Sequence, residues 1–361
     1  MPDLPVLELH HDPAPRPRKK GPSAYDLAKI AFFFFGFPKN AFGSIDVTNR
    51  CNLRCRHCYY YAPPEEELPD ELAADAWVAR LEALRRQNPF WEFPFFNCSW
   101  VGGDPLIRKG IIERCKKFFR YNTVVTNGTI PLPDWPDVNW YVSIDGDEEL
   151  HEQIRDPQRH FRRNGGAGIH ARIKNNLERS KHLGITITYC INRENVRCIE
   201  KVVKEWYEAG AKHVTFDFFT PVEGLDDGLW LDFAERDRVI DKLIALRRVY
   251  GDFFVLPERA FRLMRSATAR DVTDNCLLRT KSFALDAAGQ PKGKCVMGDT
   301  ADCDRCGCVV PFYLRSLTDR TLILRDLGAS AVNGGQRLLA QIGLTDPTAA
   351  AGGGDGGATA R

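Results

Sequence analysis

Residues 44–58 read SIDVTNRCNLRCRHC, a short β-branched run followed by the three cysteines Cys51, Cys55 and Cys58. The run 44–48 predicts a β-strand, and the cysteines follow it closely. Thiolates select iron–sulfur clusters, zinc or copper(I). A structural zinc site uses four ligands, usually in two CxxC-like halves, and CxxxCxxC has a different spacing. Three thiolates can instead hold three irons of a [4Fe–4S] cube and leave the fourth iron open to another ligand.

Beyond this stretch, β-branched or aromatic runs alternate with helical patterns. Because strands that alternate with helices form βα units, the chain is predicted to be an α/β protein with a parallel sheet. The predicted strands after the first are 95–101, 122–126, 139–144, 185–191 and 213–219. Helices are predicted from Pro69 onward with Trp77 on the apolar face, and at 107–119, 168–183, around 199–206 and at 233–250.

Specialised polar or glycine motifs follow these strands. GGDP begins at Gly102 after the second strand, TNG follows the third, and SIDG begins at Ser143 at the end of the fourth. In parallel α/β barrels the functional site is built at the carboxyl ends of the strands. We therefore expect these motifs and the three cysteines to lie at one rim of the sheet.

The overall composition indicates the cellular compartment and its redox state. The chain has 361 residues, a formal net charge of +2 and twelve cysteines, so its charge gives no general attraction for nucleic acid or an anionic membrane. The N-terminus has no signal peptide, and the apolar run 30–37 is too short to cross a bilayer. We therefore expect a cytoplasmic protein without a transmembrane segment, whose clustered cysteines serve metal or redox chemistry.

The CxxxCxxC spacing and the wording CNLRC resemble the signature of radical S-adenosylmethionine (SAM) enzymes, with His57 where the family has an aromatic residue before the third cysteine. The resemblance implies a partial (β/α)6 TIM-like barrel with a [4Fe–4S] cluster on Cys51, Cys55 and Cys58. The open iron would chelate SAM, whose reductive cleavage gives a 5′-deoxyadenosyl radical that attacks an unactivated carbon. A flavodoxin- or ferredoxin-type protein would donate the electron.

The motifs after the strands extend the resemblance over about residues 42–221. GGDP resembles the GGEP motif that contacts the SAM amino group, with Asp104 in place of the longer glutamate. SIDG resembles the ribose and carboxylate motif, and INREN follows the fifth strand. The residues that the resemblance assigns to cofactor binding are His57, Gly102, Gly103, Asp104, Ser143 and Asn192.

A second set of thiols, the C-terminal cysteine group, consists of Cys276, Cys295, Cys303, Cys306 and Cys308. The stretch 282–295, SFALDAAGQPKGKC, has a hairpin pattern, and the whole segment resembles the SPASM/twitch extension of radical SAM enzymes. The resemblance implies one auxiliary [4Fe–4S] cluster held by four of the five thiols, so that one thiol is not a ligand. The alternative is a structural zinc site. The remaining cysteines are expected to be small buried residues: Cys98, Cys115, Cys190 and Cys198.

These motifs divide the chain into six predicted segments. They are a disordered tail at 1–22, a lead-in at 23–41, the barrel at 42–250, the auxiliary-cluster region at 251–315, a C-terminal segment at 316–347 and a flexible tail at 348–361.

The substrate is left open between a peptide and a small molecule. No leader-peptide-binding domain is evident in the short N-terminus, which weakens the peptide hypothesis. The apolar run in 24–40 leaves a lipid-like substrate as a further hypothesis, although packing under the barrel is the preferred interpretation. No residue is assigned to hydrogen transfer. The alternative from another class is a zinc-stabilised binding protein without enzymatic activity.

Overall fold

The computed structural model describes residues 42–62, 68–87, 95–163, 166–225 and 227–318. Seven parallel strands form one sheet in the order β6-β5-β4-β3-β2-β1-β7. A helix follows each strand from β1 to β6 except β3, which leads directly to β4, and the predicted α/β class with a partial barrel is confirmed. The strands are β1 (Phe42–Asp46), β2 (Phe95–Val101), β3 (Phe119–Thr126), β4 (Val138–Ser143), β5 (Thr186–Ile191), β6 (His213–Phe218) and β7 (Ser282–Leu285).

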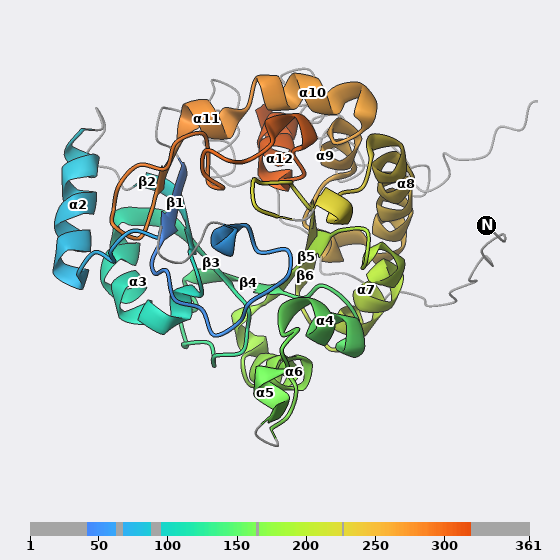
Figure 1. Cartoon of the computed structure of the whole chain (residues 1–361), viewed down its shortest axis with the longest axis horizontal. Coiled ribbons are helices and arrows are strands. Elements are labelled where there is room, and N and C mark those ends of the chain that lie inside the picture. Colours follow the sequence, from blue (N-terminus) through green and yellow to red (C-terminus); the bar gives the residue numbers. More distant parts are fainter. Residues whose placement is uncertain (1–41, 63–67, 88–94, 164–165, 226, 319–361) are drawn as a thin grey trace, which may run out of the picture.

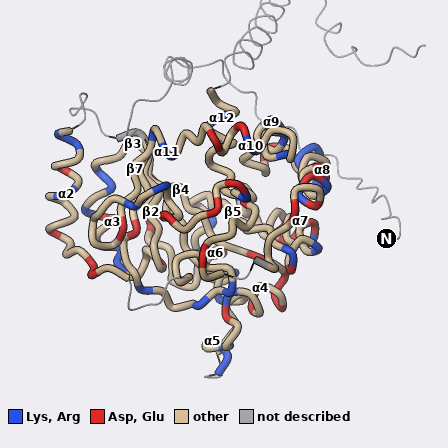
Figure 2. The backbone as a smooth tube through the Cα atoms, turned by 45° about the horizontal axis from the view of Figure 1, so that its top comes forward, with Lys and Arg blue, Asp and Glu red and all other residues tan. Residues whose placement is uncertain are grey.

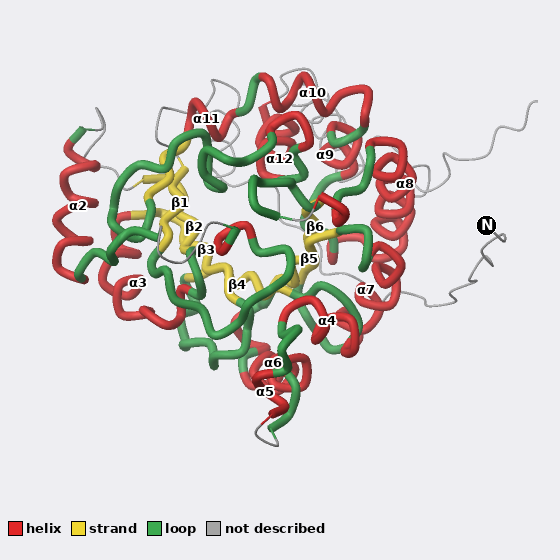
Figure 3. The backbone as a smooth tube through the Cα atoms, viewed as in Figure 1, coloured by secondary structure: helices red, strands yellow, loops and turns green. Residues whose placement is uncertain are grey.

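The strands form a curved arc with helices on its outer side (Figures 1 and 3). Its longer helices are α2 (Ala74–Arg86), α3 (Lys109–Cys115), α4 (Glu148–Arg155), α6 (Ile169–Arg179), α7 (Ile199–Glu208) and α8 (Phe233–Tyr250). The C-terminal part adds α9 (Glu258–Leu263), α10 (Ser266–Asp274), α11 (Leu277–Lys281) and α12 (Val309–Thr318). Short helices include η1 (Tyr59–Tyr61), η3 (Pro105–Arg108), η4 (Lys116–Phe118), α5 (His160–Arg163), η5 (Lys181–Leu183), η6 (Val196–Cys198), η7 (Asp227–Leu229), η8 (Gly251–Phe253) and η9 (Cys303–Arg305).

The main core lies between the sheet and the outer helices. Four tryptophans are fully buried there: Trp77, Trp100, Trp140 and Trp206. Each large aromatic side chain removes much apolar surface from water, at about 25 cal/mol per Å². The core therefore holds the outer helices against the strands and fixes the strand ends that carry the site.

The first helix begins later than the sequence predicts. α2 starts at Ala74 rather than near Pro69, because the preceding residues bond to other segments. The Leu72 amide donates to Ala287 O at 2.7 Å, and Glu71 Oε1 accepts from the Asn49 amide at 2.8 Å. These contacts hold the segment extended beside the cysteines. By contrast, the predictions for 95–101 and 233–250 match β2 and α8 in full.

The predicted hairpin at 282–295 forms only in part. Its first arm becomes β7, which pairs in parallel with β1 as a seventh strand of the main sheet. The second arm contributes only the bridge between Leu285 and Pro291, next to a turn in which Gly289 has a φ of +74°. The C-terminal region is therefore attached to the barrel edge through backbone pairing.

Three of the four scattered cysteines are buried as predicted, and one differs. Cys98, Cys115 and Cys198 are buried, but Cys190 is only partly so. It alternates with the buried Tyr189 and Ile191 along β5 and therefore lies on the opposite face of that strand.

Charged residues of both signs are interspersed on the outer helices, as on α2 and α8 (Figure 2). Within the described ranges, no helix is both long and apolar enough to cross a membrane. The predicted tails, the lead-in and the apolar run at 30–37 lie outside the described residues.

Candidate functional site

The three N-terminal cysteines lie in the loop of residues 47–58, here called the cysteine loop, which leaves the carboxyl end of β1 and ends at η1. Figure 1 shows this loop in blue, crossing the opening of the arc of strands. The sulfur-bearing residues Cys51, Cys55 and Cys58 are all partly buried. Tyr60 lies in η1 and its hydroxyl donates to Asn49 Oδ1 at 2.6 Å, which fastens the loop onto itself.

The glycines of the GGDP motif pack directly against the backbone of the cysteine loop. The Gly103 amide donates to Thr48 O and the Asp104 amide donates to Arg50 O, both at 2.8 Å. A Cβ on Gly103 would lie 2.2 Å from Arg50 O. Gly102 has a φ of +116°, and a Cβ there would lie 2.5 Å from Thr48 O. The motif therefore holds the cysteine loop at the end of β2, and side chains at either glycine would displace it.

The Asp104 carboxylate is used inside the protein. Its Oδ2 accepts from Thr126 Oγ1 at 2.8 Å and from the Asn127 amide at 2.9 Å, while Oδ1 accepts from the Leu106 amide at 3.0 Å. Burial raises the pKa of this carboxyl despite the three hydrogen bonds. Asp104 thus ties the end of β3 to the cysteine loop, and the Asn127 Nδ2 amide donates to Cys51 Sγ at 3.6 Å.

His57 takes part in a buried charged network. Its Nε2 lies 3.2 Å from Asp145 Oδ2, and the same oxygen accepts from Arg155 Nε at 2.6 Å. Burial opposes ionisation of Asp145, but the charges of Arg155 and His57 outweigh it and hold the pKa of this carboxyl below its usual range. The Arg155 Nη1 atom also donates to Cys55 Sγ at 3.9 Å, so the network places a positive charge beside a thiol.

Two further predicted residues lie at the ends of β4 and β5. Ser143 is the last residue of β4 and is paired with Thr188 of β5. The Asn192 Oδ1 atom accepts from the Glu194 amide at 2.9 Å and from the Asn195 amide at 3.2 Å, which forms the turn after β5. The predicted cofactor-binding residues therefore lie at or beyond the carboxyl ends of β1, β2, β4 and β5, at one rim. The Asp104 and Asn192 side chains already have partners within the protein.

The three thiols suit a positively charged partner. Burial raises the pKa of Cys51 to about 11, and it raises the pKa of Cys55 and Cys58 as well. Thiols must lose their protons to bind a metal, and a cluster supplies the positive charge that the buried thiolates lack. The Asn127 and Arg155 donors at the sulfurs are the hydrogen-bonding environment that a thiolate-held cluster uses. These residues therefore fit a three-thiolate iron–sulfur cluster.

The C-terminal cysteine group is brought together by the fold. All five of its thiols line one small cavity, which is otherwise bordered mainly by apolar groups. Burial raises the pKa of Cys306 to about 12, and negative charge on Cys276, Cys295 and Cys303 adds to this effect. Within the described part of the chain, no three Cys, His, Asp or Glu side chains converge closely enough to hold a single metal ion.

The loop that carries the last three cysteines packs on the end of β6. The Phe218 amide donates to Gly307 O at 2.9 Å, and the Gly307 amide donates to Thr220 Oγ1 at 2.8 Å. The Val309 amide donates to Asp217 Oδ1 at 2.7 Å. The C-terminal cysteine group therefore adjoins the same rim of the sheet as the cysteine loop.

The sequence did not single out the side chains that contact the thiols. Asn127 lies within TNG, Asp145 lies within SIDG and Arg155 follows in α4. Only the fold shows that they meet Cys51, His57 and Cys55. The position of a motif after a strand does not show which way its side chains point. The sequence around these residues therefore could not predict the contacts.

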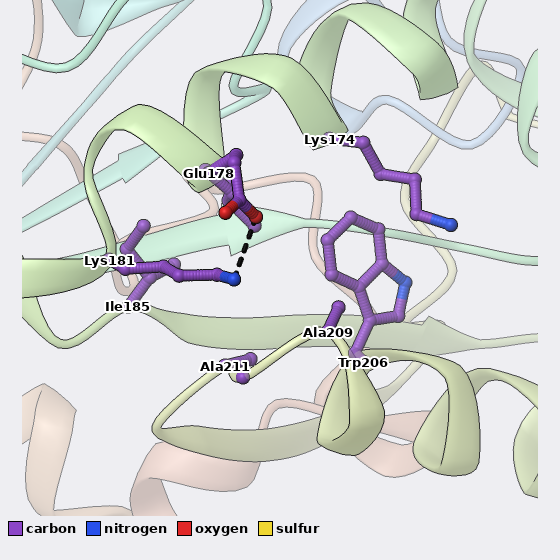
Figure 4. Close-up of a pocket in the computed structure, with 9 residues that line it drawn as sticks. Lys174, Glu178, Lys181, Ile185, Trp206, Ala209 and Ala211 are labelled. Atoms are coloured by element: carbon purple, nitrogen blue, oxygen red, sulfur yellow. Dashed lines mark ion pairs between the residues drawn. The ribbon is translucent and has the colours of Figure 1, made fainter.

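A separate hollow lies between α6 and α7 on the outer side of the barrel (Figure 4). Trp206 and Lys174 border it, and Lys181 forms an ion pair with Glu178 at 2.7 Å. It contains no cysteine and none of the strand-end motifs, so we assign it no part in the chemistry.

Comparisons with known proteins agree with this site. The radical SAM superfamily matches residues 45–205. The sporulation killing factor maturation protein SkfB of Bacillus subtilis is 25% identical over 229 residues, which cover 58% of this chain and 50% of SkfB. GTP 3′,8-cyclase of Peptoclostridium acidaminophilum is 33% identical over 92 residues, which cover 24% of this chain and 26% of the cyclase. The chain thus spans about half or less of the length of these relatives.

A solved structure shares the fold. Streptococcus suis SuiB bound to the precursor peptide SuiA superposes with a TM-score of 0.53 and 12% identity, covering 86% of this chain and 74% of SuiB. The match over residues 45–205 contains the cysteine loop and the strand-end motifs up to Asn192. With its fold and its ordered motifs, the region 45–205 of this chain is thus similar to the radical SAM superfamily.

Proposed function

We propose that this chain is a radical SAM enzyme that acts on an unactivated carbon of a peptide. Its 5′-deoxyadenosyl radical would either abstract hydrogen from that carbon or add the adenosyl group to it. Cys51, Cys55 and Cys58 would hold a [4Fe–4S] cluster, which when bound supplies the electron that cleaves SAM to a 5′-deoxyadenosyl radical. The observation that carries this proposal is the single rim of strand ends on which the cysteine loop and the ordered motifs meet.

The chain's own residues would position the cofactor. Gly102, Gly103, Asp104, Ser143 and Asn192 would line SAM, with backbone groups prominent because the Asp104 and Asn192 side chains already bond within the protein. His57 would act by fixing the cysteine loop through Asp145.

The C-terminal cysteine group would hold an auxiliary [4Fe–4S] cluster at the same rim. Its five thiols share one cavity, and the buried Arg236 donates to the Cys306 backbone oxygen. Two of its nitrogen atoms have no hydrogen-bond partner among the described residues, which suits a negatively charged group nearby. A structural zinc ion is the competing occupant. Iron and sulfide analysis of the protein distinguishes the two.

A peptide substrate is favoured by two of the relatives. SkfB is named for maturation of a killing factor, and SuiB was solved with a precursor peptide. GTP 3′,8-cyclase, whose name gives a nucleotide substrate, supports a small molecule as the second candidate. The lipid-like hypothesis depended on residues 24–40, which lie outside the described residues.

The test of SAM cleavage is an assay for 5′-deoxyadenosine after anaerobic reconstitution and reduction with dithionite. Cys55→Ala should abolish the product, because it removes a cluster ligand. Cys98→Ala is the matched control, since Cys98 is a core residue of β2, and it should retain product formation. Zinc at both cysteine groups with no iron after reconstitution would disprove the proposal.

The test of the substrate class is incubation with a short peptide encoded beside this gene, with GTP as the small-molecule comparison. A SAM-dependent change in the mass of the peptide supports a peptide substrate. Conversion of GTP with an unchanged peptide would instead support the second candidate.

A further inference from the structure

Arg236 is a fully buried arginine in α8, next to the C-terminal cysteine group. Its Nη1 atom donates to Cys306 O at 3.0 Å. Its Nε and Nη2 atoms have no hydrogen-bond partner among the residues described. The guanidinium carbon lies 4.8 Å from the centre of the Phe218 ring and 5.3 Å from that of Phe233, so the charged group is enclosed by aromatic faces and the cysteine-bearing loop.

A buried charge without a counter-charge is costly, by several kcal/mol per ion. In the parts of the chain that are described, Arg236 forms no ion pair with a carboxylate. The negative charges that favour its protonated form are the Cys306 thiolate and, after it, Asp237. The guanidinium of arginine stays protonated in proteins at neutral pH. The positive charge is therefore retained and directed toward the C-terminal cysteine group.

An iron–sulfur cluster held by four thiolates is the kind of partner that this charge lacks. The cluster and its ligands carry net negative charge, and one-electron reduction makes that charge more negative. A fixed positive charge in a low-dielectric surrounding stabilises the reduced form more than the oxidised form. Hydrogen bonds and charges beside the ligands are among the features by which a protein sets such a potential.

We propose that Arg236 is the counter-charge of the auxiliary cluster and raises its reduction potential. The inference rests on the auxiliary cluster of the proposed function. Arg236 does not touch the reacting atoms, so it is a positioning residue that acts through the Cys306 loop. The Phe218 and Phe233 rings pack against the guanidinium and help to exclude water from it.

The test is a redox titration of the reconstituted full-length protein, followed by the electron paramagnetic resonance signal of the auxiliary cluster. The barrel signal is removed by replacing Cys51, Cys55 and Cys58 with alanine, and dithionite supplies the electron. Arg236→Gln keeps a hydrogen-bond donor and removes the charge, and it should make reduction about tenfold less favourable, a shift of about 59 mV to more negative potential. Arg236→Lys keeps the charge and should stay close to the parent value.

Arg238→Gln is the matched control, because Arg238 lies on the same helix but is exposed, and it should leave the potential unchanged. Equal shifts in Arg236→Gln and Arg236→Lys would overturn the inference, because they would assign the effect to the arginine's shape and not its charge. An unchanged potential in Arg236→Gln would overturn it too. If Arg236→Gln fails to hold iron, the test is the reduction potential of the auxiliary cluster in Arg236→Lys. A potential equal to that of the parent protein supports the inference, and a lower one refutes it.

Failure of the underlying auxiliary cluster has a different signature. In that case the protein with alanine at Cys51, Cys55 and Cys58 contains no iron after reconstitution, before any change at Arg236. If that protein contains iron but its reduction potential is the same with and without Arg236, the auxiliary cluster is supported and only the role of the arginine is refuted.

Discussion

Asp145 connects two side chains that come from different parts of the chain. His57 belongs to the cysteine loop and Arg155 to the last turn of α4, and both meet one carboxylate oxygen. Asp145→Asn keeps the shape of the side chain but leaves the Arg155 charge buried without its carboxylate counter-charge. We expect it to destabilise the fold by about 3–5 kcal/mol, as measured by urea unfolding at pH 7.

This stabilisation should depend on pH in a defined direction. The pKa of Asp145 in the folded protein lies below the value of about 3.9 expected when it is unfolded. The contribution is therefore present in full above about pH 4 and is lost as the pH falls through the folded-state pKa. Unfolding of iron-free protein should show that the difference between wild type and Asp145→Asn shrinks below about pH 4.

The control for Asp145 is Asp147, two residues later. Asp147 pairs with Lys201 at 2.8 Å, a lysine that is 67% exposed, and it accepts a hydrogen bond from the Leu150 amide at the start of α4. An asparagine can also cap the helix, so Asp147→Asn should cost less than about 1 kcal/mol. A cost equal to that of Asp145→Asn would show that the buried network is not the source of the stability.

At the scale of single side chains, the sequence predicts types of residue better than their partners. The thiols and glycines stand out because few other residues suit their roles. His57 stays a predicted cofactor contact, and the sequence carried no signal that its Nε2 atom lies against Asp145. Arg236 had no signal at all, because an arginine in an amphipathic helix is usually exposed and only the fold shows that this one is buried.

At the scale of elements, the turn after β2 and the cysteine loop form one unit. Gly103→Ala would force Arg50 O away from a Cβ at 2.2 Å and break the bond from the Asp104 amide to that oxygen. Such overpacking costs about 1–3 kcal/mol. We expect the variant to lose most of the iron bound by the cysteine loop, as measured by iron analysis, and to form little 5′-deoxyadenosine.

Gly110→Ala provides the matched control for this element. A Cβ on Gly110 would meet nothing within 4 Å, and the residue lies in α3. Alanine favours a helix over glycine by about 0.5–1 kcal/mol, so this variant should be slightly more stable with unchanged iron content. Iron loss in Gly110→Ala, or full iron content in Gly103→Ala, would contradict a specific role for the turn.

The alternation of strands and helices could be predicted because periodicity is a local property. β2 and α8 agree with their predictions to the residue, since each is bounded by its own sequence signals. α2 and β7 could not be predicted in the same way. The start of α2 depends on bonds from Leu72 and Glu71 to distant segments, and β7 depends on pairing with β1. Both outcomes are decided by tertiary contacts that a single stretch does not contain.

At the scale of the whole molecule, the fold places two cysteine groups at one rim, and the two groups share no thiol. The cysteine loop is held by β1, β2 and β3, whereas the loop of Cys303, Cys306 and Cys308 is held by β6. Two sites with separate ligands should fill independently. Reconstituted wild type is therefore expected to contain about eight irons per chain, four for each [4Fe–4S] cluster.

Variants of either group test this independence. Alanine at Cys51, Cys55 and Cys58 should leave about four irons and abolish 5′-deoxyadenosine formation. Alanine at Cys303 and Cys306 should also leave about four irons but retain SAM cleavage, because the ligands and strand ends of the barrel site are untouched. Loss of all iron in either variant would show that the two sites depend on each other. Four irons in wild type that disappear only with the barrel cysteines would instead restrict the iron to the barrel and leave the C-terminal cysteine group to another metal.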